Sequence, residues 1–298
     1  MKDQKIGLIG LGSMGSEMAL KFLAAGYDLT VYDIKPERLS PIISAGATEA
    51  RNAANLAKKV DLVMTSLRDS AVWVSVTKTE LLPHAKSGQT FIDFGTTVVH
   101  QTQQLAEALI TKEATLLDVP VSGGPVGIRN GNLHMFAGGC REEFDRCLPL
   151  LSVIGDPKRI VYCGPSGSGQ VVKGVNQLAM GLGAAAYLEA IAFGVNSCIE
   201  LDAICQAVGG TSGWRCHFES VAQRVQQGDG NQVYVKFPEL HYFLDQAERQ
   251  GYEIPLTQVL YDFSRRQDFI IPDNMGRDSH PFWHALMSTG QQSDPPEV

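Results

Sequence analysis

The stretch "GLIGLGSMG", residues 7–15, decides the fold, together with the residues on either side of it. It completes an apolar run, "KIGLIG" (5–10), that is typical of a buried strand. It leads into "SEMALKFLAAG" (16–26), where apolar residues recur at helical spacing and a glycine closes the segment. A strand, a G-x-G-x-x-G pattern and a helix in this order are typical of a turn that binds the phosphates of a dinucleotide.

Each glycine of the pattern has a physical reason to be there. Gly10 permits the tight turn, Gly12 lets the backbone approach a pyrophosphate, and Gly15 lets the helix pack against the strand. The helix N-terminus adds N–H donors and a positive partial charge for the phosphates. A glycine turn without a ligand is the alternative. The predicted cofactor-binding loop consists of Gly10, Leu11, Gly12, Ser13, Met14 and Gly15.

An acidic residue ends the next predicted strand. Asp33 closes the run 28–33, and its carboxylate can accept hydrogen bonds from both hydroxyls of the adenosine ribose. The same charge repels a 2′-phosphate, so the sequence favours NAD over NADP. Lys35 and Arg38 follow closely and leave NADP open as the alternative.

Short apolar runs alternate with helix-like segments through the first half of the chain. This alternation predicts a doubly wound α/β sheet. The predicted strands are 5–10, 28–33, 61–67, 90–95, 115–121, 134–139 and 159–164.

The pattern changes near residue 164, after which helical spacing dominates. We therefore predict an α/β fold, with an N-terminal Rossmann-type doubly wound parallel sheet in a domain of residues 1–164. An all-helical C-terminal domain, residues 165–298, follows it. Its predicted helices are 168–197, 201–208, 213–227, 236–250 and 255–267.

Composition narrows the class of function. The net charge of −7, with no long basic run, predicts no nucleic-acid partner and no anionic membrane partner. The six cysteines form no C-x-x-C pair, which favours reduced thiols, no metal site and a cytoplasmic protein. Residues 2–5 are charged and polar, so we expect no signal peptide. The apolar stretch 178–195 contains Glu189 and many small residues, so we interpret it as a buried helix and not a membrane span.

Two further segments follow predicted strands. Residues 66–72, which include Leu67, follow the third strand, and residues 93–97, which include Thr96, follow the fourth. Doubly wound sheets bind ligands at the carboxyl ends of their strands, so both segments are candidates for cofactor contacts. An ordinary turn is the alternative for each.

A glycine-rich turn interrupts "DVPVSGGPVGIRNGNL", residues 118–133. Consecutive backbone N–H groups at Gly123 and Gly124, with the hydroxyl of Ser122, can cradle a carboxylate. A plain glycine turn explains the pattern equally well.

A lysine stands at the head of the small and aliphatic segment 164–186. On a helix, Lys173 shares one face with Asn176, Gln177 and Met180. Burial there would destabilise its ammonium and lower its pKa toward the range that suits proton transfer. The alternative is a surface lysine that extends its charge into water.

Three motifs, in order, resemble one family. They are "GLIGLGSMGSEMA" (7–19), "DVPVSGGPVGIRNGNL" (118–133) and "GSGQVVKGVNQ" (167–177). The chain resembles the β-hydroxyacid dehydrogenases, the family of 3-hydroxyisobutyrate dehydrogenase and tartronate semialdehyde reductase, distantly related to 6-phosphogluconate dehydrogenase. The resemblance covers nearly the whole chain. It implies an NAD(P)-binding Rossmann domain, an all-helical second domain, and an active site between them.

The resemblance also implies roles for single residues. Ser122, Gly123 and Gly124 would bind the substrate carboxylate, and Lys173 would be the general acid and base with Asn176 beside it. Thr96 would face the cofactor. Gln177 matches the reductase branch of the family, and Trp214, after "GGTSG" (209–213), is our candidate for limiting substrate size. The long helix after Lys173 often packs between subunits in this family, which implies a homodimer or homotetramer.

These residues predict reversible hydride transfer between NAD and a small 3-hydroxy acid or its semialdehyde, with Lys173 exchanging the proton. One alternative is an NADPH-dependent glyoxylate or succinic semialdehyde reductase, against which Asp33 argues. Another is a module of the same fold that binds a dinucleotide without catalysis, against which Lys173 argues.

The chain departs from the family pattern at several positions, and these departures leave the identity of the substrate open. Gly95 replaces the serine of Asp-x-Ser-Thr, Arg68 replaces a proline, and "PEL" (238–240) replaces "KDL", with Lys236 two residues early. His280 and His284 are four apart, but Pro281 and the lack of a third ligand argue that both are structural.

Overall fold

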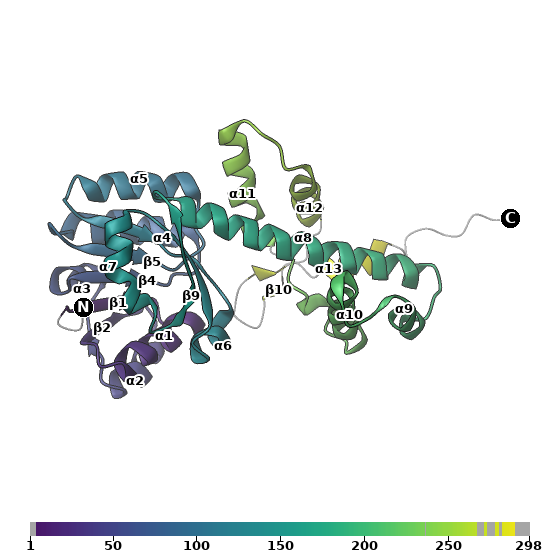
Figure 1. The fold of residues 1–298 in the computed structure, drawn as a ribbon, viewed down its shortest axis with the longest axis horizontal. Helices are drawn as coiled ribbons and strands as arrows, with labels where there is room; N and C mark the ends of the chain where they lie inside the picture. The colour runs from purple at the N-terminus through teal and green to yellow at the C-terminus, as the bar shows by residue number, and fades with distance from the viewer. Residues whose placement is uncertain (1–3, 236, 267–270, 273–277, 280–281, 290–298) are drawn as a thin grey trace. The chain divides into compact units, whose positions relative to one another are not determined.

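The computed structural model describes residues 4–235, 237–266, 271–272, 278–279 and 282–289. The chain separates into two compact units, Met1–Gly174 and Val175–Val298. The first unit carries a large sheet and the second is mostly helical (Figure 1).

Within the described residues, nine strands of the first unit form one sheet. Its order begins β3-β2-β1-β4-β5-β6, and all of these strands are parallel. β8 runs antiparallel to both β6 and β7, and β9 runs parallel to β8. The strands are β1 Ile6–Ile9, β2 Leu29–Tyr32, β3 Thr48–Glu49, β4 Leu62–Thr65, β5 Thr90–Asp93, β6 Thr115–Asp118, β7 Val121–Ser122, β8 Leu133–Gly138 and β9 Gly155–Gly164.

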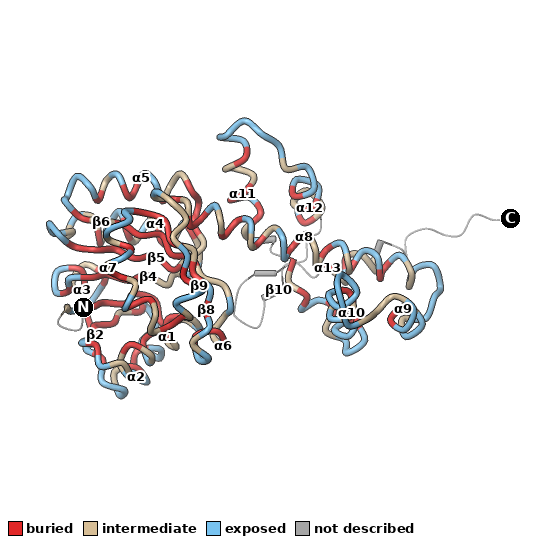
Figure 2. The backbone as a smooth tube through the Cα atoms, viewed as in Figure 1, coloured by how far each residue is buried: buried red, intermediate tan, exposed pale blue. Residues whose placement is uncertain are grey.

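This order confirms the predicted doubly wound sheet. β1 pairs with β2 on one side and with β4 on the other, so the direction of winding reverses there. The crevice outside the carboxyl ends of β1 and β4 is where such sheets bind ligands. All four residues of β1, β4 and β5 are buried, as the apolar runs predicted, and they form the red interior of the unit in Figure 2.

Helices cover both faces of the sheet. α1 and α2 pack on one face through Phe22 and Ile42, and α4 and α5 pack on the other through Trp73 and Leu109 (Figure 1). A π-helix turn, η1, continues α4 directly. The helical elements of this unit are α1 Ser13–Ala24, α2 Pro36–Ser44, α3 Ala53–Lys59, α4 Ser70–Val76, η1 Thr77–Leu81, η2 Leu82–His84, α5 Val99–Ile110, α6 Gly124–Arg129, α7 Arg141–Leu151 and the start of α8 Ser168–Asn196.

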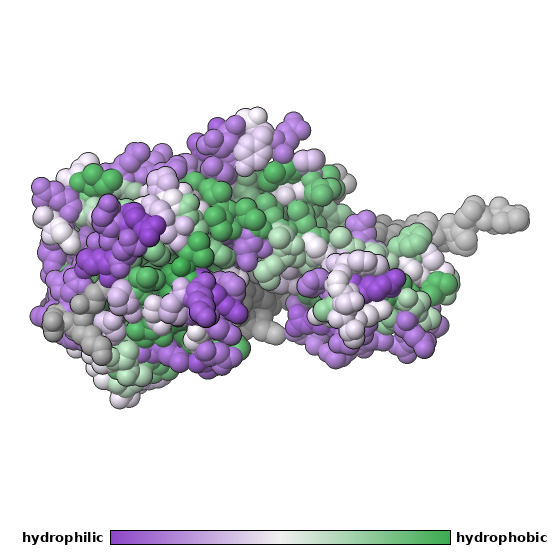
Figure 3. Space-filling model, in the orientation of Figure 1, coloured by the Kyte–Doolittle hydropathy of each residue, from purple (hydrophilic) through white to green (hydrophobic). Residues whose placement is uncertain are grey.

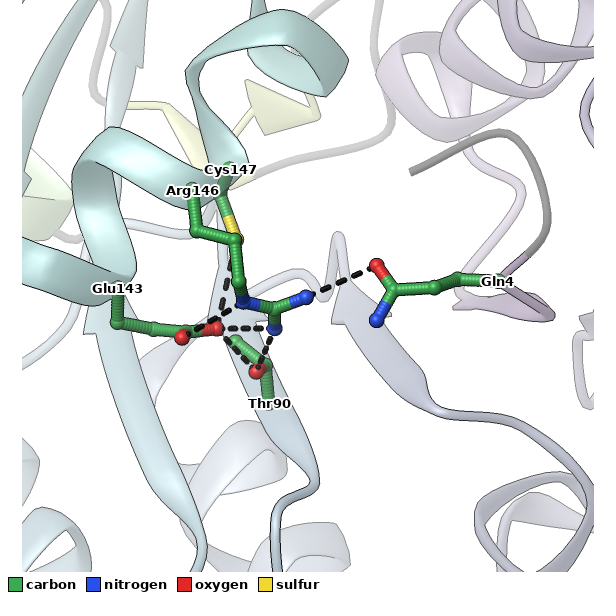
Figure 4. A network of polar contacts seen from close by, with 5 residues as sticks. All are labelled: Gln4, Thr90, Glu143, Arg146 and Cys147. Atoms are coloured by element: carbon green, nitrogen blue, oxygen red, sulfur yellow. Dashed lines mark hydrogen bonds and ion pairs between the residues drawn. The ribbon is translucent and has the colours of Figure 1, made fainter.

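A polar network fixes α7 to the amino end of β5 (Figure 4). The guanidinium of Arg146 donates to Gln4 Oε1 at 2.9 Å and to Thr90 Oγ1 at 2.7 Å, and it pairs with the carboxylate of Glu143. Burial raises the pKa of the neighbouring Cys147 thiol to about 12, so this thiol is unreactive at neutral pH. Because Thr90 begins its strand, the network lies at the edge of the sheet away from the predicted ligand site.

The helices that the sequence predicts after residue 164 are present, with ends that differ by a residue at most. The region is mostly and not entirely helical, because β10 and β11 form a two-stranded sheet that the sequence did not predict, as it did not predict α13. Its core joins α8, α10 and α11 through residues such as Leu188, Phe218 and Leu240. Its elements after α8 are α9 Leu201–Val208, α10 Gly213–Gln226, η3 Gly230–Gln232, α11 Phe237–Gln250, α12 Pro255–Arg266, β10 Ile271–Pro272, β11 Asp278–Ser279 and α13 Phe282–Thr289.

The prediction that residues 178–195 form a buried helix is correct for one side of α8 only. Among the described residues α8 is the helix whose length and composition would suit a membrane span, and 28% of its most apolar window is buried. Leu188 and Ile191 face the core, whereas Met180 and Phe193 are exposed. Figure 3 shows apolar atoms over part of the visible side of this helix. An exposed apolar face is typical of a surface that another chain covers.

Candidate functional site

The glycine loop between β1 and α1 has the geometry that phosphate binding needs. Gly10 has φ +93°, a backbone conformation that residues other than glycine rarely adopt. A methyl group at Gly15 would lie 1.9 Å from the carbonyl oxygen of Gly10, so only glycine lets α1 start this close to β1. A methyl group at Gly12 would meet nothing within 4 Å. Open space at Gly12, in front of the α1 N-terminus, fits a pyrophosphate.

The carboxylate of Asp33 is tied to this loop. Its Oδ2 accepts a hydrogen bond from the backbone N–H of Leu11 at 2.7 Å, and its Oδ1 accepts one from the N–H of Lys35 at 2.8 Å. Arg38 forms an ion pair with Oδ2 at 3.5 Å. Asp33 therefore holds the glycine loop against the end of β2. At this position its carboxylate can also accept hydrogen bonds from the hydroxyls of a ribose.

The segment after β4 lies against the same loop. A methyl group at Gly10 would touch the backbone oxygen of Ser66 and the side chain of Leu67 at 3.1 Å. Leu67 is half-buried beside the core, so the structure brings it next to the predicted cofactor loop. Arg68, which replaces the family proline, is exposed and pairs with Asp69 at 2.9 Å.

The segment after β5 contains a buried acid. Asp93 Oδ1 accepts hydrogen bonds from Thr65 Oγ1 at 2.7 Å and from the N–H of Gly95 at 3.2 Å. Its Oδ2 is buried and has no hydrogen-bond partner among the described residues. Burial raises the pKa of Asp93 to about 7, with a smaller contribution from Asp118. Thr96 follows Gly95 in the same segment and is half-buried.

The predicted carboxylate cradle forms a tight turn between β7 and α6. Gly123 has φ +129° and Gly124 has φ +63°, so the backbone of this turn favours glycine at both positions. Ser122 ends β7, opposite His134 of β8. The turn therefore lies beyond an antiparallel strand that extends the sheet past β6.

Lys173 reaches this turn. Its side chain is buried, with 6% of the residue exposed, and its Nζ donates to the backbone oxygen of Val121 at 2.7 Å. The alternative of a surface lysine is therefore wrong. The structure brings the predicted proton-transfer group beside Ser122, one residue from its hydrogen-bond acceptor.

Asp118 caps the helix that carries Lys173, and sequence reasoning missed it. Its Oδ1 accepts from the N–H of Gly167 at 2.8 Å and its Oδ2 accepts from the N–H of Gln170 at 3.1 Å. Burial raises the pKa of Asp118 to about 7, against the effect of these hydrogen bonds. An acid at the end of the apolar strand β6 was the available signal.

Gln170 was missed as well, because the motif that contains it (167–177) drew attention to Lys173 instead. Its Oε1 accepts from the N–H of Thr97 at 3.0 Å, and its Nε2 donates to the oxygen of Gly95 at 3.0 Å. The residue is 1% exposed. Its amide thus joins α8 to the segment after β5, on both sides of Thr96.

Further along α8, in the second unit, three polar side chains form a chain of hydrogen bonds. Asn176 Nδ2 donates to Gln177 Oε1 at 3.2 Å, and Gln177 Nε2 donates to the carboxylate of Glu239. Asn176 also contacts Met180 Sδ at 3.6 Å, which confirms that these residues share a helix face. Glu239 belongs to "PEL" in the first turn of α11, and its role was missed because the sequence drew attention to Pro238 instead.

The remaining candidates have less specific surroundings. Trp214 lies in the first turn of α10 and is 53% exposed, with the Arg215 guanidinium 4.8 Å from its ring centre. His284 donates its backbone N–H to Asn231 Oδ1 at 2.8 Å. His280 and Lys236 lie outside the described residues. Over the described part of the chain, no group of three His, Cys, Asp or Glu side chains could hold a metal ion.

Comparison with known proteins agrees with this geometry. Residues 5–164 match the family model of the NAD binding domain of 6-phosphogluconate dehydrogenase. Residues 167–267 match the model described as NAD-binding of NADP-dependent 3-hydroxyisobutyrate dehydrogenase. The two models together cover nearly all of the described residues.

Individual relatives point the same way. An uncharacterized oxidoreductase, YkwC of Bacillus subtilis (strain 168), is 33% identical over 86% of this chain and 91% of its own length. The 2-(hydroxymethyl)glutarate dehydrogenase of Eubacterium barkeri is 29% identical over 87% of each chain. A crystal structure of 3-hydroxyisobutyrate dehydrogenase from Salmonella typhimurium has a TM-score of 0.75, with 26% identity over 96% of this chain and 100% of that chain.

The fold and the glycine loop define an NAD(P)-binding oxidoreductase. Within that class, the chain belongs to the 3-hydroxyisobutyrate dehydrogenase family. The comparisons confirm the family resemblance, the fold class and the dinucleotide cofactor that the sequence predicted.

Proposed function

We propose that this protein catalyses reversible hydride transfer between NAD and a small 3-hydroxy acid or its semialdehyde. The observation that carries the proposal is the buried Lys173, whose Nζ lies 2.7 Å from the oxygen of Val121, next to the SGG turn. The named relatives are dehydrogenases of 2-(hydroxymethyl)glutarate and of 3-hydroxyisobutyrate. Both compounds have a hydroxymethyl group on the carbon that bears a carboxylate, which is the arrangement we propose for the substrate.

The chain's own residues provide binding and proton transfer. Ser122, with the backbone N–H groups of Gly123 and Gly124, binds the substrate carboxylate in the tight turn after β7. This anchor holds the carbinol carbon at a fixed distance from the turn, within reach of Lys173. Lys173 Nζ takes the hydroxyl proton during oxidation and returns it during reduction. The oxygen of Val121 orients the amine for both steps.

The cofactor is held by the glycine loop, Asp33, Leu67 and Thr96. When bound, the nicotinamide supplies or accepts the hydride. We propose NAD as the preferred form, because the Asp33 carboxylate at the end of β2 repels a 2′-phosphate. The alternative, an NADPH-dependent semialdehyde reductase, is favoured by Arg38, which lies 3.5 Å from the same carboxylate.

Residues of the second unit complete the proposal. Asn176 and Gln177 contact the substrate from α8, and Trp214 limits its size. The exposed apolar face of α8 packs against a second copy in a homodimer or homotetramer. We further propose a cytoplasmic protein, with residues 1–164 binding the dinucleotide and residues 165–298 supplying substrate contacts and the subunit interface.

The test is steady-state reduction of NAD⁺ with a panel of small 3-hydroxy acids, and oxidation of NADH and NADPH with the matching aldehydes. Lys173→Ala is compared with Lys112→Ala, which alters an exposed lysine in the turn after α5. We expect turnover of at least one acid by the wild type, and a kcat lower by about 10²–10⁴-fold in Lys173→Ala only. NADH binding without any turnover would instead support the module that binds a dinucleotide without catalysis.

A further inference from the structure

We propose that Gln170 is a positioning residue, whose side-chain amide sets the segment carrying Thr96 in register with the helix carrying Lys173. The inference rests on the proposed function, because it assigns Thr96 to the cofactor and Lys173 to the proton. It assigns a role to a residue that lies within the motif 167–177 but to which neither the motif nor the chemistry of the reaction gives one.

The contacts of the Gln170 amide bracket Thr96. Its Oε1 accepts from the N–H of Thr97, and its Nε2 donates to the oxygen of Gly95, both at 3.0 Å. These partners are 73 and 75 residues away in the sequence. One planar group therefore fixes the backbone immediately before and immediately after Thr96.

The backbone of Gln170 is fixed as well. Its N–H donates to Asp118 Oδ2 at 3.1 Å, and this hydrogen bond fixes the start of α8 relative to the end of β6. Lys173 follows three residues later, one helical turn along, and is held by Val121 at its far end. A continuous path of hydrogen bonds and one helical turn thus joins the segment of Thr96 to the proposed proton-transfer group.

Few side chains could replace this amide. A glutamine presents a donor and an acceptor on one rigid plane, whereas methionine of similar length presents no donor and only a weak acceptor, and an ionised glutamate presents acceptors only. At 1% exposure, water does not reach the site to replace a lost partner. Removal of the amide leaves the N–H of Thr97 and the oxygen of Gly95 unpaired, and we expect the segment around Thr96 to shift.

The first experiment compares Gln170→Met with Gln103→Met. Gln103 is an exposed glutamine on α5 that contacts the backbone oxygen of Ser166 and has no proposed role in the site. In the Gln170 variant we expect kcat to fall by about 10–100-fold, because small misplacements of a reacting group have effects of this size. We expect the Gln103 variant to keep wild-type kcat.

Binding provides a readout that does not depend on turnover. Affinities for NADH and for ADP are measured on the wild type and both variants by intrinsic fluorescence or calorimetry. ADP lacks the nicotinamide half of the cofactor, which is the part we expect Thr96 to face. Gln170→Met should therefore weaken NADH binding by at least about fivefold and ADP binding by less than about twofold. If no hydroxy acid turns over in the wild type, the proposed function fails, and this pair of affinities still decides the role of Gln170.

A second variant separates positioning from loss of stability. In Gln170→Glu the introduced carboxyl lies beside Asp118, near Asp93 on the adjacent strand and one turn before Lys173, and burial favours its neutral form. When protonated, it can donate to Gly95 and accept from Thr97 as the glutamine does. We expect its kcat, relative to wild type, to recover as pH falls from about 8 to about 5.5.

Three results would overturn the inference. They are an unchanged kcat in Gln170→Met, equal weakening of NADH and ADP, or a Gln170→Glu variant whose relative activity does not depend on pH. Thermal unfolding of each variant is recorded at both pH values, so that a loss of activity that only follows unfolding counts against positioning.

Discussion

The amide of Gln177 donates a hydrogen bond to the carboxylate of Glu239, and this contact sets the direction of a short polar chain. A carboxylate only accepts, so Gln177 must present Nε2 to Glu239 and Oε1 to its other neighbour. That neighbour is Asn176, whose Nδ2 donates to Oε1 at 3.2 Å. The opposite end of the Asn176 amide is its oxygen. Glu239 therefore orients the Asn176 amide, with its Nδ2 toward Gln177 and its oxygen on the opposite side.

This relationship predicts the effect of Glu239→Gln. An amide at position 239 can donate or accept, so Gln177 can rotate and Asn176 loses its fixed orientation. We expect kcat for the hydroxy acid to fall by roughly tenfold, with NADH affinity unchanged, because we assign none of the residues in this polar chain to the cofactor. Glu248→Gln, an exposed position on α11, is the control. Equal kcat values in the two variants would show that Glu239 does not orient Asn176.

Two buried acids predict how stability depends on pH. Asp93 and Asp118 each have a pKa raised to about 7 by burial, against an ordinary value of 3.8. Between these values the folded protein keeps protons that the unfolded chain has lost. The free energy of unfolding should therefore fall as pH rises from about 4 to about 7, by about 1.4 kcal/mol per pH unit for each acid.

Urea unfolding at several pH values measures this slope. In Asp93→Asn one of the two acids no longer titrates, so the slope between about pH 4 and 7 should become about half as steep. Asp28→Asn, which alters an exposed acid before β2, should keep the wild-type slope. A variant at Asp93 with the wild-type slope would mean that this carboxyl is ionised throughout the range.

Gly95 explains part of this behaviour. A methyl group there would lie 3.3 Å from Asp93 Oδ1 and 3.4 Å from Oδ2, and Oδ2 is the buried oxygen without a partner among the described residues. The family serine at this position would bring a hydroxyl donor to that carboxylate. The departure from Asp-x-Ser-Thr thus leaves Asp93 with fewer donors and a higher affinity for its proton.

We therefore predict that Gly95→Ser stabilises the ionised form of Asp93. A new hydrogen bond to the carboxylate should raise the free energy of unfolding at pH 8 by about 1–2 kcal/mol and change it less at pH 5. The measurement is urea unfolding at both pH values. Equal destabilisation at pH 5 and pH 8 would indicate that the added side chain does not fit beside Asp93.

The sequence predicted the elements of this fold well, because apolar spacing and glycines are local signals. It placed Lys173 and Asn176 on one helix face and located the glycine loop, whose pattern lies within nine residues (7–15). It did not find Gln170 or Glu239. Their partners are 62 to 75 residues away, and a buried glutamine or an acid in a first helical turn looks like any other polar residue until the chain folds. It also missed the two-residue strand β3, which is too short for periodicity to detect.

Asp33 and Arg38 predict how cofactor preference can be changed. The carboxylate of Asp33 faces the Arg38 guanidinium at 3.5 Å, so it compensates the positive charge of the arginine. Asp33→Asn removes the charge that repels a 2′-phosphate and releases Arg38 to bind it. We expect the ratio of kcat/KM with NADP to that with NAD to rise by at least about tenfold. Because Asp33 also holds the N–H groups of Leu11 and Lys35, affinity for NAD should fall at the same time.

The double variant Asp33→Asn/Arg38→Ala is the control, and it should lose the gain with NADP. If the double variant keeps that gain, Arg38 does not bind the phosphate and the preference depends on the charge of Asp33 alone.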